Sequence, residues 1–585
     1  MYLKKLAVKN FRVIKALELD FHEGVNILIG ENNSGKSAII DVLRIVFSYG
    51  SQWRDIGIHL CDFHIERNSL EPESSNIEFD LFFCITIPEE SGWFNELLSI
   101  NPINGDQELA LHFKYYKEKI RGEEVVRWRV WGGDNEGQRV SSEVLEMLAF
   151  VYLEALRDST QYLRPIRGSK LGQLYHNVVT EEEKREHLAQ KLRTTLHDDD
   201  EWEAVITEGK NKVNAHLKET SIKGKEQQVD INFLPFEFKR LVENLRIQMP
   251  IFPSEILNGN EDKQRYFEVY QNGLGQNNLI YIATILGNLK QKTGQDHESY
   301  LALLIEEPEA HLHPQLQKIL FDYLGRLNNL RVQLFITSHS PTITAKSNLD
   351  SLIILQKQKD IVTSLAIRES ALTHENKKYL SKFLDVTKSQ LFFANGVILV
   401  EGISELLLMP IFSQMMGIQF DTEKNGIEIV NINGVAFSHF ARLFNPADPR
   451  KRLAARCSII TDDDRSSAGK ESSRALRAQF LEKGMLKVFL GRKTFEYELF
   501  TTGRNKDILL DVFRKIKPRA ASNLNLTGVL ESDAEKFANK ISANKAKSEF
   551  AHKLAIALEE DASFRAMLTV PEYIKKAIEW VIAGN

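Results

Sequence analysis

The segment VNILIGENNSGKS, residues 25–37, decides the fold of the N-terminal half of the chain. Its second part, GENNSGKS from Gly30 to Ser37, matches the phosphate-binding loop pattern GxxxxGK[ST] in full. An apolar strand, Val25–Ile29, precedes the loop, and the apolar run SAIIDVLRIVF follows it with helical spacing. The backbone N–H groups of such a loop wrap phosphates, and the following helix presents its positive end to them. The segment therefore predicts an α/β fold that binds ATP, with Lys36 on the terminal phosphates and Ser37 on magnesium.

Length and composition describe a globular chain with more than one domain. Its 585 residues exceed what one hydrophobic core usually serves. No apolar run approaches the roughly 18 residues of a membrane span, and the N-terminus lacks the pattern of an export signal, so we expect a cytoplasmic protein without membrane contact. The net charge of −5 does not indicate nucleic-acid binding, which must therefore rest on local clusters. The scattered Cys61, Cys84 and Cys457 exclude a disulfide scaffold and are expected to be buried apolar side chains.

Two downstream segments complete the predicted apparatus for ATP hydrolysis. The apolar strand Leu301–Ile305 ends in Glu306 and Glu307. Glu306 would orient magnesium through water, with a longer arm than the Asp that is common there, and Glu307 would position the attacking water. The strand Leu334–Thr337 then carries His339 to the edge of the sheet. There it resembles the switch histidine of ABC-type ATPases.

The run QNGLGQNNLIYIA, residues 271–283, is a degenerate ABC signature. Gly273, Gly275 and Gln276 precede its apolar helix. In ABC-type ATPases the signature of one subunit closes over the nucleotide of another, so ATP binding would imply a head-to-tail dimer. A glycine-rich turn before a helix equally suits a plain N-cap. The register with the other three motifs favours the signature.

The segment between the phosphate loop and the signature changes from strands to polar helices. Strand-like pieces span Asn76–Ile87, Leu109–Tyr116 and Val125–Trp131. Residues Glu181–Lys225 are highly charged and lack the sustained heptads of a long coiled coil. We interpret them as a helical dimerisation insert, and their HDDDE run as solvated surface rather than a metal site.

Two acidic clusters follow in the last third of the chain. In VILVEGISE, Glu401 ends an apolar strand and Glu405 lies one helical turn beyond it. In SIITDDDR, Ser458–Ile460 reads as a buried strand, with Asp462 and Asp464 at its carboxyl end on the same side of the backbone. Four carboxylates at the ends of parallel strands repel one another unless divalent cations neutralise them. We therefore expect magnesium or manganese at this place.

The two clusters together resemble a Toprim domain, the metal-binding fold shared by topoisomerases, primases and certain nucleases. An ABC-type ATPase followed by Toprim resembles the OLD (overcoming lysogenization defect) family. The resemblance runs almost end to end, through KNFR (9–12), the phosphate loop, YLEALRDSTQYLRPIRGSKLG (152–172), NGLGQNNL, EEPEAHLHP, ITSHSP, LVEG, ITDDDR, KTFEYEL (493–499), KSEFA (547–551) and VPEYIKKAI (570–578). It implies an ABC-type ATPase at 1–175 and 246–391, a helical insert at 176–245, and a Toprim domain with a parallel, helix-flanked sheet at 392–585.

The resemblance also implies roles for individual residues. Two cations per site would cleave a phosphodiester in line, one activating water and the other stabilising the leaving oxygen, about 4 Å apart. The implied metal ligands are Glu401, Glu405, Asp462 and Asp464, completed by Thr494 and Glu496. Glu498 lies on the same predicted strand face, so its exclusion stays open. Lys547 would offset transition-state charge, with a solvated helix lysine as the alternative. The nucleotide contacts would be Arg12, Asn33, Gly35, Lys36, Ser37, Ala38, Gly273, Gly275, Gln276 and Glu306, with Glu307 and His339 as catalytic residues.

The function that follows from the resemblance is an ATP-gated DNA endonuclease of anti-phage defence that uses water as its nucleophile. Its expected partners are DNA, further copies of the same chain in a homodimer or higher homo-oligomer, and a defence partner such as a helicase-like protein, a retron or a toxin. Two alternatives stay open: a RecF-like repair ATPase that binds DNA without cutting it, and an ATPase that only senses nucleotide or a partner. Cutting of DNA by the intact chain would separate the first alternative from the nuclease.

Two basic clusters are candidates for phosphate contacts with DNA. The first comprises Arg157, Arg164, Arg167 and Lys170, and the second comprises Arg450, Lys451, Arg452 and Arg456. The first cluster belongs to the ATPase half of the family pattern, so contact with nucleotide or another subunit is an equal alternative there. The second cluster precedes the Asp pair in the sequence and is favoured for DNA.

Overall fold

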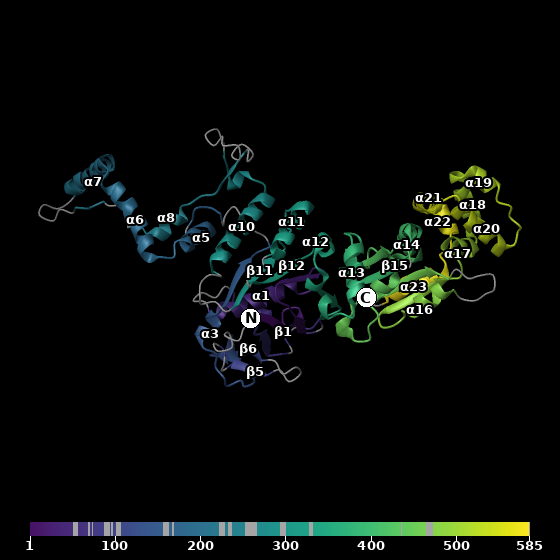
Figure 1. Cartoon of the computed structure of the whole chain (residues 1–585), viewed down its shortest axis with the longest axis horizontal. Helices are drawn as coiled ribbons and strands as arrows, with labels where there is room; N and C mark the ends of the chain where they lie inside the picture. Colours follow the sequence, from purple (N-terminus) through teal and green to yellow (C-terminus); the bar gives the residue numbers. More distant parts are fainter. Residues whose placement is uncertain are drawn as a thin grey trace. The chain divides into compact units, whose positions relative to one another are not determined.

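The computed structural model describes residues 1–50, 56–67, 69, 71–72, 74–86, 94, 97–100, 107–155, 163–166, 169–220, 228–231, 237–251, 266–292, 300–326, 332–434, 436–463 and 472–583. The chain divides into two compact units. The first comprises Met1–Tyr152, Ser299–Glu309 and Pro314–Asn585, and it holds the three larger sheets. The second comprises Leu153–Glu298 and Ala310–His313, and its described residues are mostly helical (Figure 1).

An antiparallel sheet begins the first unit. Its order is β2-β1-β4-β6-β5, with β7 paired to β6. The strands are β1 (Tyr2–Phe11), β2 (Ile14–Asp20), β4 (Asn76–Cys84), β5 (Leu98–Ile100), β6 (Gln107–Ile120) and β7 (Glu123–Gly132). Buried and half-buried side chains alternate along β4, as one covered face requires. Strands β4, β6 and β7 confirm the three strand-like pieces that the sequence predicts.

A mixed sheet carries the nucleotide motifs. Its order is β14-β13-β3-β12-β11-β8, and β13, β3, β12 and β11 are parallel. The strands are β3 (Val25–Gly30), β8 (Leu148–Leu153), β11 (Tyr300–Glu306), β12 (Val332–Ser338), β13 (Leu352–Gln358) and β14 (Ile361–Ala366). Every residue of β3, β11 and β12 is buried, which is typical of central parallel strands. Their carboxyl ends therefore bring the phosphate loop, Glu306 and His339 to one edge.

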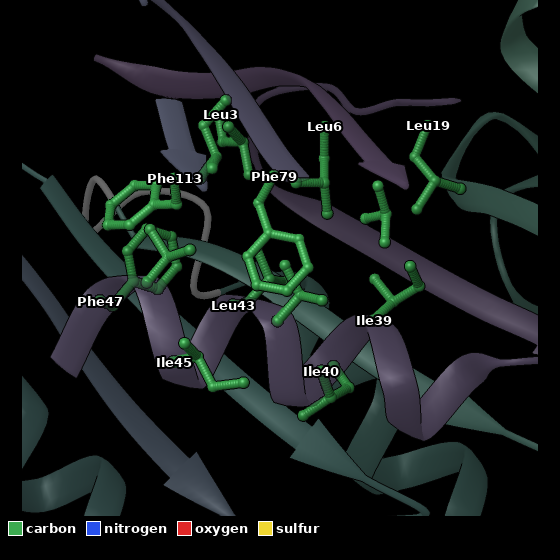
Figure 2. Packing of buried hydrophobic residues seen from close by; sticks show 14 of the residues in the cluster. Leu3, Leu6, Leu19, Ile39, Ile40, Leu43, Ile45, Phe47, Phe79 and Phe113 are labelled. Atoms are coloured by element: carbon green, nitrogen blue, oxygen red, sulfur yellow. The ribbon is translucent and has the colours of Figure 1, made fainter. Parts of the chain in front are cut away.

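Helix α1 (Lys36–Phe47) packs between these two sheets and forms the core of the ATPase part. Figure 2 shows Ile39, Leu43 and Phe47 on the side of the helix that faces Leu3, Leu6, Leu19, Phe79 and Phe113 of the antiparallel sheet, and Ile40 and Ile45 on the opposite side. Burying each of these side chains contributes about 1.5–3 kcal/mol, so the loop at the helix N-terminus rests on a rigid base.

The Toprim part has a four-stranded, fully parallel sheet in the order β16-β15-β17-β18. The strands are β15 (Gly396–Val400), β16 (Ile427–Asn431), β17 (Arg456–Asp462) and β18 (Leu486–Gly491). Helix α23 (Glu572–Ile582) packs on β15, β17 and β18, while α14 (Ile403–Met416) contacts β16 and α16 (Ser473–Gln479) contacts β17 and β18. The parallel, helix-flanked sheet confirms the predicted fold of this part.

The KTFEYEL segment differs from the prediction. It is not a strand but the start of helix α17 (Phe495–Thr501), with Thr494 as its N-cap. The alternation of polar and apolar residues in this segment is typical of a strand with one buried face. Residues 495–500 are all buried, however, so the alternation does not separate a buried face from an exposed one. Helices α18 (Asn505–Ile516), α19 (Pro518–Ser522), α20 (Leu530–Ala543), α21 (Lys547–Glu560) and α22 (Ala562–Met567) follow.

The second unit contains α5 (Lys170–Val178), α6 (Glu182–His197), α7 (Asp200–Thr220), α8 (Phe238–Glu243), α10 (Leu274–Lys292) and the two-stranded β9 (Gln248–Pro250) and β10 (Tyr266–Glu268). Helices α6 and α7 confirm the predicted helical character of the insert. Asp199 of the HDDDE run accepts hydrogen bonds from the backbone N–H groups of Glu201 (3.2 Å) and Trp202 (3.0 Å), so it caps α7. The remaining helices are α3 (Ser142–Glu146), α11 (Pro314–Gly325), α12 (Pro341–Lys346), α13 (His374–Phe383) and α15 (Phe437–Ala441).

Two further expectations concern the surface of the molecule. None of the helices that the structure describes is long and apolar enough to cross a membrane. All three cysteines are free thiols, as expected, but only Cys457 is buried; Cys84 is half-buried and Cys61 is exposed. Cys61 follows Leu60 in a short turn at the surface, which a count of cysteines does not reveal.

Candidate nucleotide site and candidate metal centre

The phosphate loop is held in shape by its own lysine. The Lys36 ammonium donates hydrogen bonds to the carbonyl oxygens of Gly30 (2.8 Å) and Glu31 (2.6 Å). Burial lowers the pKa of Lys36 to about 8, although the nearby Glu307 and Glu31 oppose this effect. A Cβ atom at Gly30 would lie 2.1 Å from the carbonyl oxygen of Leu355, so this position requires glycine. Asn33 (φ 62°) and Gly35 (φ 96°) adopt left-handed backbone conformations that complete the loop, and Ala38 is buried in α1.

Both carboxylate oxygens of Glu306 accept hydrogen bonds. The Ser37 hydroxyl donates to Oε2 (3.1 Å), and the Tyr152 hydroxyl donates to Oε1 (2.8 Å). The Arg44 guanidinium lies 3.6 Å from the centre of the Tyr152 ring and holds that ring from its other side. Burial raises the pKa of Glu306, which the two hydrogen bonds oppose. No role was predicted for Tyr152 itself, although Tyr152 begins the segment YLEALRD, which is part of the family resemblance.

Glu307 and His339 lie together, as the sequence predicts for hydrolytic residues. The His339 Nε2 atom is 3.3 Å from Glu307 Oε1. Glu307 has a left-handed backbone (φ 42°), a strained conformation for a non-glycine residue that is typical of functional sites. Burial and the charge of Lys36 lower the pKa of His339. Glu309, which the sequence analysis did not assign, accepts from the Ser338 hydroxyl (2.7 Å) and the His339 backbone N–H (3.0 Å) and so fixes this end of β12.

Arg12 forms ion pairs with two carboxylates. Its guanidinium contacts Asp41 at 2.5 Å and Asp62 at 2.8 Å. Asp41 lies on α1 and also pairs with Arg44 at 3.0 Å, so Arg12 ties the β1–β2 turn to the helix behind the phosphate loop. A contact between Arg12 and nucleotide stays a prediction.

The signature residues lie at the N-terminus of a helix. Helix α10 begins at Leu274, so Gly275 and Gln276 belong to its first turn and Gly273 precedes it. A Cβ atom at Gly275 would lie 2.5 Å from the carbonyl oxygen of His311, which gives this glycine a packing reason. The packing explains Gly275 within one chain, and its contact with the nucleotide of a second chain stays a prediction.

The carboxylates of the Toprim part lie at the carboxyl edge of its sheet. Glu401 directly follows β15, and its carboxylate contacts the Thr461 hydroxyl and the Arg474 guanidinium. It also accepts from the backbone N–H of Asp462 at 3.1 Å. Asp462 ends β17, and its Oδ2 accepts from the backbone N–H of Phe495 at 3.2 Å. The sequence did not predict Arg474, which lies in the first turn of α16.

Two further carboxylates are buried beside Glu401 and Asp462. Glu405 is 8% exposed and Glu496 is 2% exposed. Burial, and next to it the charges of Glu496 and Glu401, raise the pKa of Glu405 to about 7. The Lys547 ammonium lies 3.3 Å from Glu496 Oε2. Burial opposes the charge of Lys547, but Glu496, Asp462 and Glu405 outweigh it and raise the Lys547 pKa. The Lys547 side chain is 46% exposed at the start of α21, and its ammonium contacts this carboxylate group, so its catalytic role stays a prediction.

The other residues considered as metal ligands make different contacts or lie outside the described residues. The Thr494 hydroxyl accepts from the Tyr497 backbone N–H at 3.3 Å and so caps α17. Glu498 accepts from the backbone N–H (2.8 Å) and Nε (3.1 Å) of Arg492, which directs its carboxylate to that arginine. Asp464 lies outside the described residues. Its neighbour Asp463 is buried and accepts from the Ser472 backbone N–H at 3.1 Å.

The oxygen donors of this region suit a divalent cation, although they do not yet form a coordination shell. Among the described residues, no three His, Cys, Asp or Glu side chains come close enough to hold a metal ion. Glu496 Oε2 is buried and, within the described part of the chain, pairs with Lys547 without a hydrogen bond. A Cβ atom at Gly491 would lie 3.3 Å from Asp462 Oδ1, so glycine lets the chain pass close to that oxygen. Carboxylate oxygens are the hard ligands that magnesium and manganese prefer.

The second basic cluster does not lie beside these carboxylates. Arg456 begins β17 and Asp462 ends it, so about 20 Å of strand separates them. Arg456 lies 4.3 Å over the Trp580 ring and donates to the Trp580 carbonyl (3.1 Å), and Arg452 donates to the Pro446 carbonyl (2.8 Å). Both side chains therefore serve packing, and only Arg450 and Lys451 are exposed. Arg157 and Arg167 of the first cluster lie outside the described residues.

Comparison with known proteins agrees with the two parts of the chain. Residues 1–120 and 146–344 match the AAA ATPase domain family AAA_15, and residues 392–464 match the TOPRIM domain of overcoming lysogenization defect protein-like proteins. The OLD nuclease of Thermus scotoductus is 24% identical over 444 residues, which cover 74% of this chain and 78% of that protein. Endonuclease GajA of Bacillus cereus is 24% identical over 374 residues, which cover 53% of each protein, so the chain spans about half the length of that relative.

Solved structures are also similar to part of this chain. The C-terminal region of the Xanthomonas campestris pv. campestris OLD protein is 22% identical, with a TM-score of 0.25, over 33% of this chain and 95% of that chain. The AAA_15 match extends over more than half of the residues, and the TOPRIM match begins where the second parallel sheet begins. The chain therefore belongs to the AAA ATPase domain family AAA_15, and it carries an OLD-like TOPRIM domain after the ATPase domain.

Proposed function

We propose that this protein is a divalent-metal-dependent DNA endonuclease whose cutting is controlled by its ATPase domain. One observation carries the proposal: Glu401, Glu405, Asp462 and Glu496 approach the carboxyl edge of one parallel sheet, with Lys547 among them. Glu405 and Glu496 are buried, and the burial of a carboxylate costs free energy unless a cation neutralises it. The names of the nuclease relatives support the same activity.

The proposed chemistry is hydrolysis of a phosphodiester by water. Two magnesium or manganese ions, when bound, supply the activation of water and the stabilisation of the leaving oxygen. Glu401, Glu405, Asp462 and Glu496 would hold them, with Thr494 and Asp464 as further ligands. Lys547 would carry a fixed positive charge to the phosphate, because its raised pKa keeps it protonated at neutral pH.

The ATPase half would use the geometry of the mixed-sheet edge. Lys36 would bind the terminal phosphates, Ser37 and Glu306 would hold magnesium, and Glu307 would orient the attacking water, with His339 beside it. The hydrogen bonds from Ser37 and Tyr152 orient the longer side chain of Glu306. We propose that ATP binding joins two such domains head to tail through residues 273–276 and that this dimer gates cutting.

The helical insert supports assembly of several chains. Helices α6 and α7 expose a set of large apolar side chains, which comprises Leu188, Leu192, Trp202, Val205 and Val213. No residue of α7 is buried among those the structure describes. Exposed apolar side chains of this kind favour contact with another copy. We therefore propose that residues 176–245 serve homodimerisation, between ATPase parts at 1–175 and 246–391, with the nuclease domain at 392–585.

The biological setting is also part of the proposal. A cytoplasmic nuclease of this kind would act on invading phage DNA, alone or with a helicase-like protein, a retron or a toxin. DNA would meet the carboxylate edge through basic side chains there, namely Arg474, Arg492, Lys493 and Lys547, rather than through Arg456 at the other end of β17.

The test is incubation of the purified protein with supercoiled plasmid and magnesium, manganese or calcium, with and without ATP. Magnesium or manganese should produce nicked or linear plasmid. Glu401→Ala and Asp462→Ala should each abolish cutting and leave ATP hydrolysis unchanged, whereas Glu423→Ala, at an exposed carboxylate of the same domain, should cut normally. Intact plasmid with every metal, together with ATP-dependent DNA binding, would instead indicate the RecF-like ATPase.

A further inference from the structure

Tyr573 brings an unpaired hydroxyl to the Toprim carboxylates. It lies in the first turn of α23, and its ring packs against the core of the Toprim part. Its hydroxyl oxygen is buried and has no hydrogen-bond partner among the residues that the structure describes. A buried polar group without a partner costs free energy and is rare in folded proteins. The rest of the ring would pack equally well without the hydroxyl, so packing alone does not explain it.

The hydroxyl-bearing end of the Tyr573 ring and Asp462 both lie close to Gly491. A Cβ atom at Gly491 would lie 3.4 Å from Tyr573 Cζ, 3.3 Å from Asp462 Oδ1 and 3.3 Å from Glu498 Cγ, so these three groups surround the same position. The other oxygen of Asp462, Oδ2, accepts from the backbone N–H of Phe495. Asp462 is thus held on one side by α17, while its Oδ1 lies close to Gly491, as does the ring end of Tyr573.

The surroundings keep the Tyr573 hydroxyl protonated. Burial, followed by the charges of Asp462, Glu405, Glu498 and Glu496, raises the pKa of Tyr573 well above its usual value. A protonated phenol surrounded by carboxylates is a hydrogen-bond donor and a poor nucleophile. This argues against attack on the phosphate by Tyr573, even though tyrosine is the nucleophile of topoisomerases with a Toprim domain.

We propose that Tyr573 is a positioning residue of the nuclease site, whose hydroxyl donates a hydrogen bond to Asp462 when Asp462 binds a divalent cation. The inference rests on the proposed nuclease function. A carboxylate oxygen has two lone pairs, so it can contact a cation and accept a hydrogen bond at the same time. Donors of this kind orient the ligands of metal sites, and their loss typically weakens metal affinity about 10–100-fold.

The test compares Tyr573→Phe with Tyr497→Phe in the full-length protein. Tyr497 is equally part of the Toprim core, but the groups that act on its hydroxyl are Glu531, Arg492 and Glu498 rather than Asp462. Manganese binding is measured by calorimetry without DNA or ATP, with Glu401→Ala to assign the heat to the Toprim site. Urea denaturation in EDTA measures the stability of each metal-free protein.

Tyr573→Phe should bind manganese about 10–100-fold more weakly than the wild type and lose no metal-free stability, because the hydroxyl has no partner to lose. Tyr497→Phe should bind manganese like the wild type. Unchanged manganese affinity in Tyr573→Phe, or a loss of metal-free stability, would overturn the inference while wild-type binding leaves the proposed function intact. A wild-type protein that takes up no manganese through Glu401 would overturn both.

Discussion

The ionisation of Glu405 gives the sharpest test of the carboxylate site. Replacing it by glutamine keeps the size of the side chain and removes its charge at every pH. The folded protein raises the pKa of Glu405 from 4.5 to about 7, chiefly through burial. A carboxyl group with a raised pKa stabilises the folded state at low pH, where it is neutral, and this advantage is lost as the pH rises from 4.5 to about 7.

The magnitude follows from the size of this shift. Each pKa unit corresponds to about 1.4 kcal/mol, so ionised Glu405 destabilises the metal-free protein by about 3 kcal/mol above pH 7. At pH 5 the group is neutral in the folded protein, and the cost falls to roughly 1 kcal/mol. Glu405→Gln should therefore be more stable than the wild type by about 3 kcal/mol at pH 8, and by roughly 1 kcal/mol at pH 5.

The assay is urea denaturation in EDTA at pH 5 and pH 8. Pulse proteolysis measures the unfolded fraction of the Toprim domain at each urea concentration. Comparing variant and wild type at the same pH cancels the titration of all other groups. At pH 8, manganese should stabilise the wild type and not Glu405→Gln, because the variant lacks the ligand charge. An equal stability difference at both pH values, or a variant less stable than the wild type at pH 8, would show that ionised Glu405 does not destabilise the metal-free protein.

Three other substitutions test the neighbouring contacts. Tyr152→Phe removes the hydrogen bond to Glu306 Oε1, and ATP hydrolysis should need about 10-fold more magnesium; an unchanged magnesium titration would contradict the role of Tyr152. Glu307→Gln should slow ATP hydrolysis by about 10²–10⁴-fold while a fluorescent ATP analogue still binds; near-normal turnover would exclude Glu307 as the residue that positions water. Lys547→Ala should lower the rate of plasmid cutting by about 10²–10³-fold without weakening manganese binding, and Lys547→Arg should restore part of the cutting rate. If the alanine variant cuts at the wild-type rate, Lys547 has no role beyond its ion pair with Glu496.

The sequence determined the features that depend on contiguous residues. Local periodicity and glycine placement predict the phosphate loop and the apolar strands that lead to Glu306 and His339. They also predict the strand before Glu401 and the helix that carries Glu405. Parallel strands align their carboxyl ends, so the sequence also predicts that Glu401 and Asp462 lie at the same edge of the sheet.

Only the tertiary structure decided which partner each polar side chain meets. The Tyr152 hydroxyl donates to Glu306, which lies 154 positions away in the sequence, and Tyr573 of α23 lies close to Gly491, as does Asp462. No local pattern encodes such neighbours. Residues 495–500 of the KTFEYEL segment lie in a helix and are all buried, so the alternation of polar and apolar residues there does not mark a half-buried strand. Local spacing sets the backbone of each element, whereas packing between distant elements sets burial, and burial determines charge states and hydrogen-bond partners.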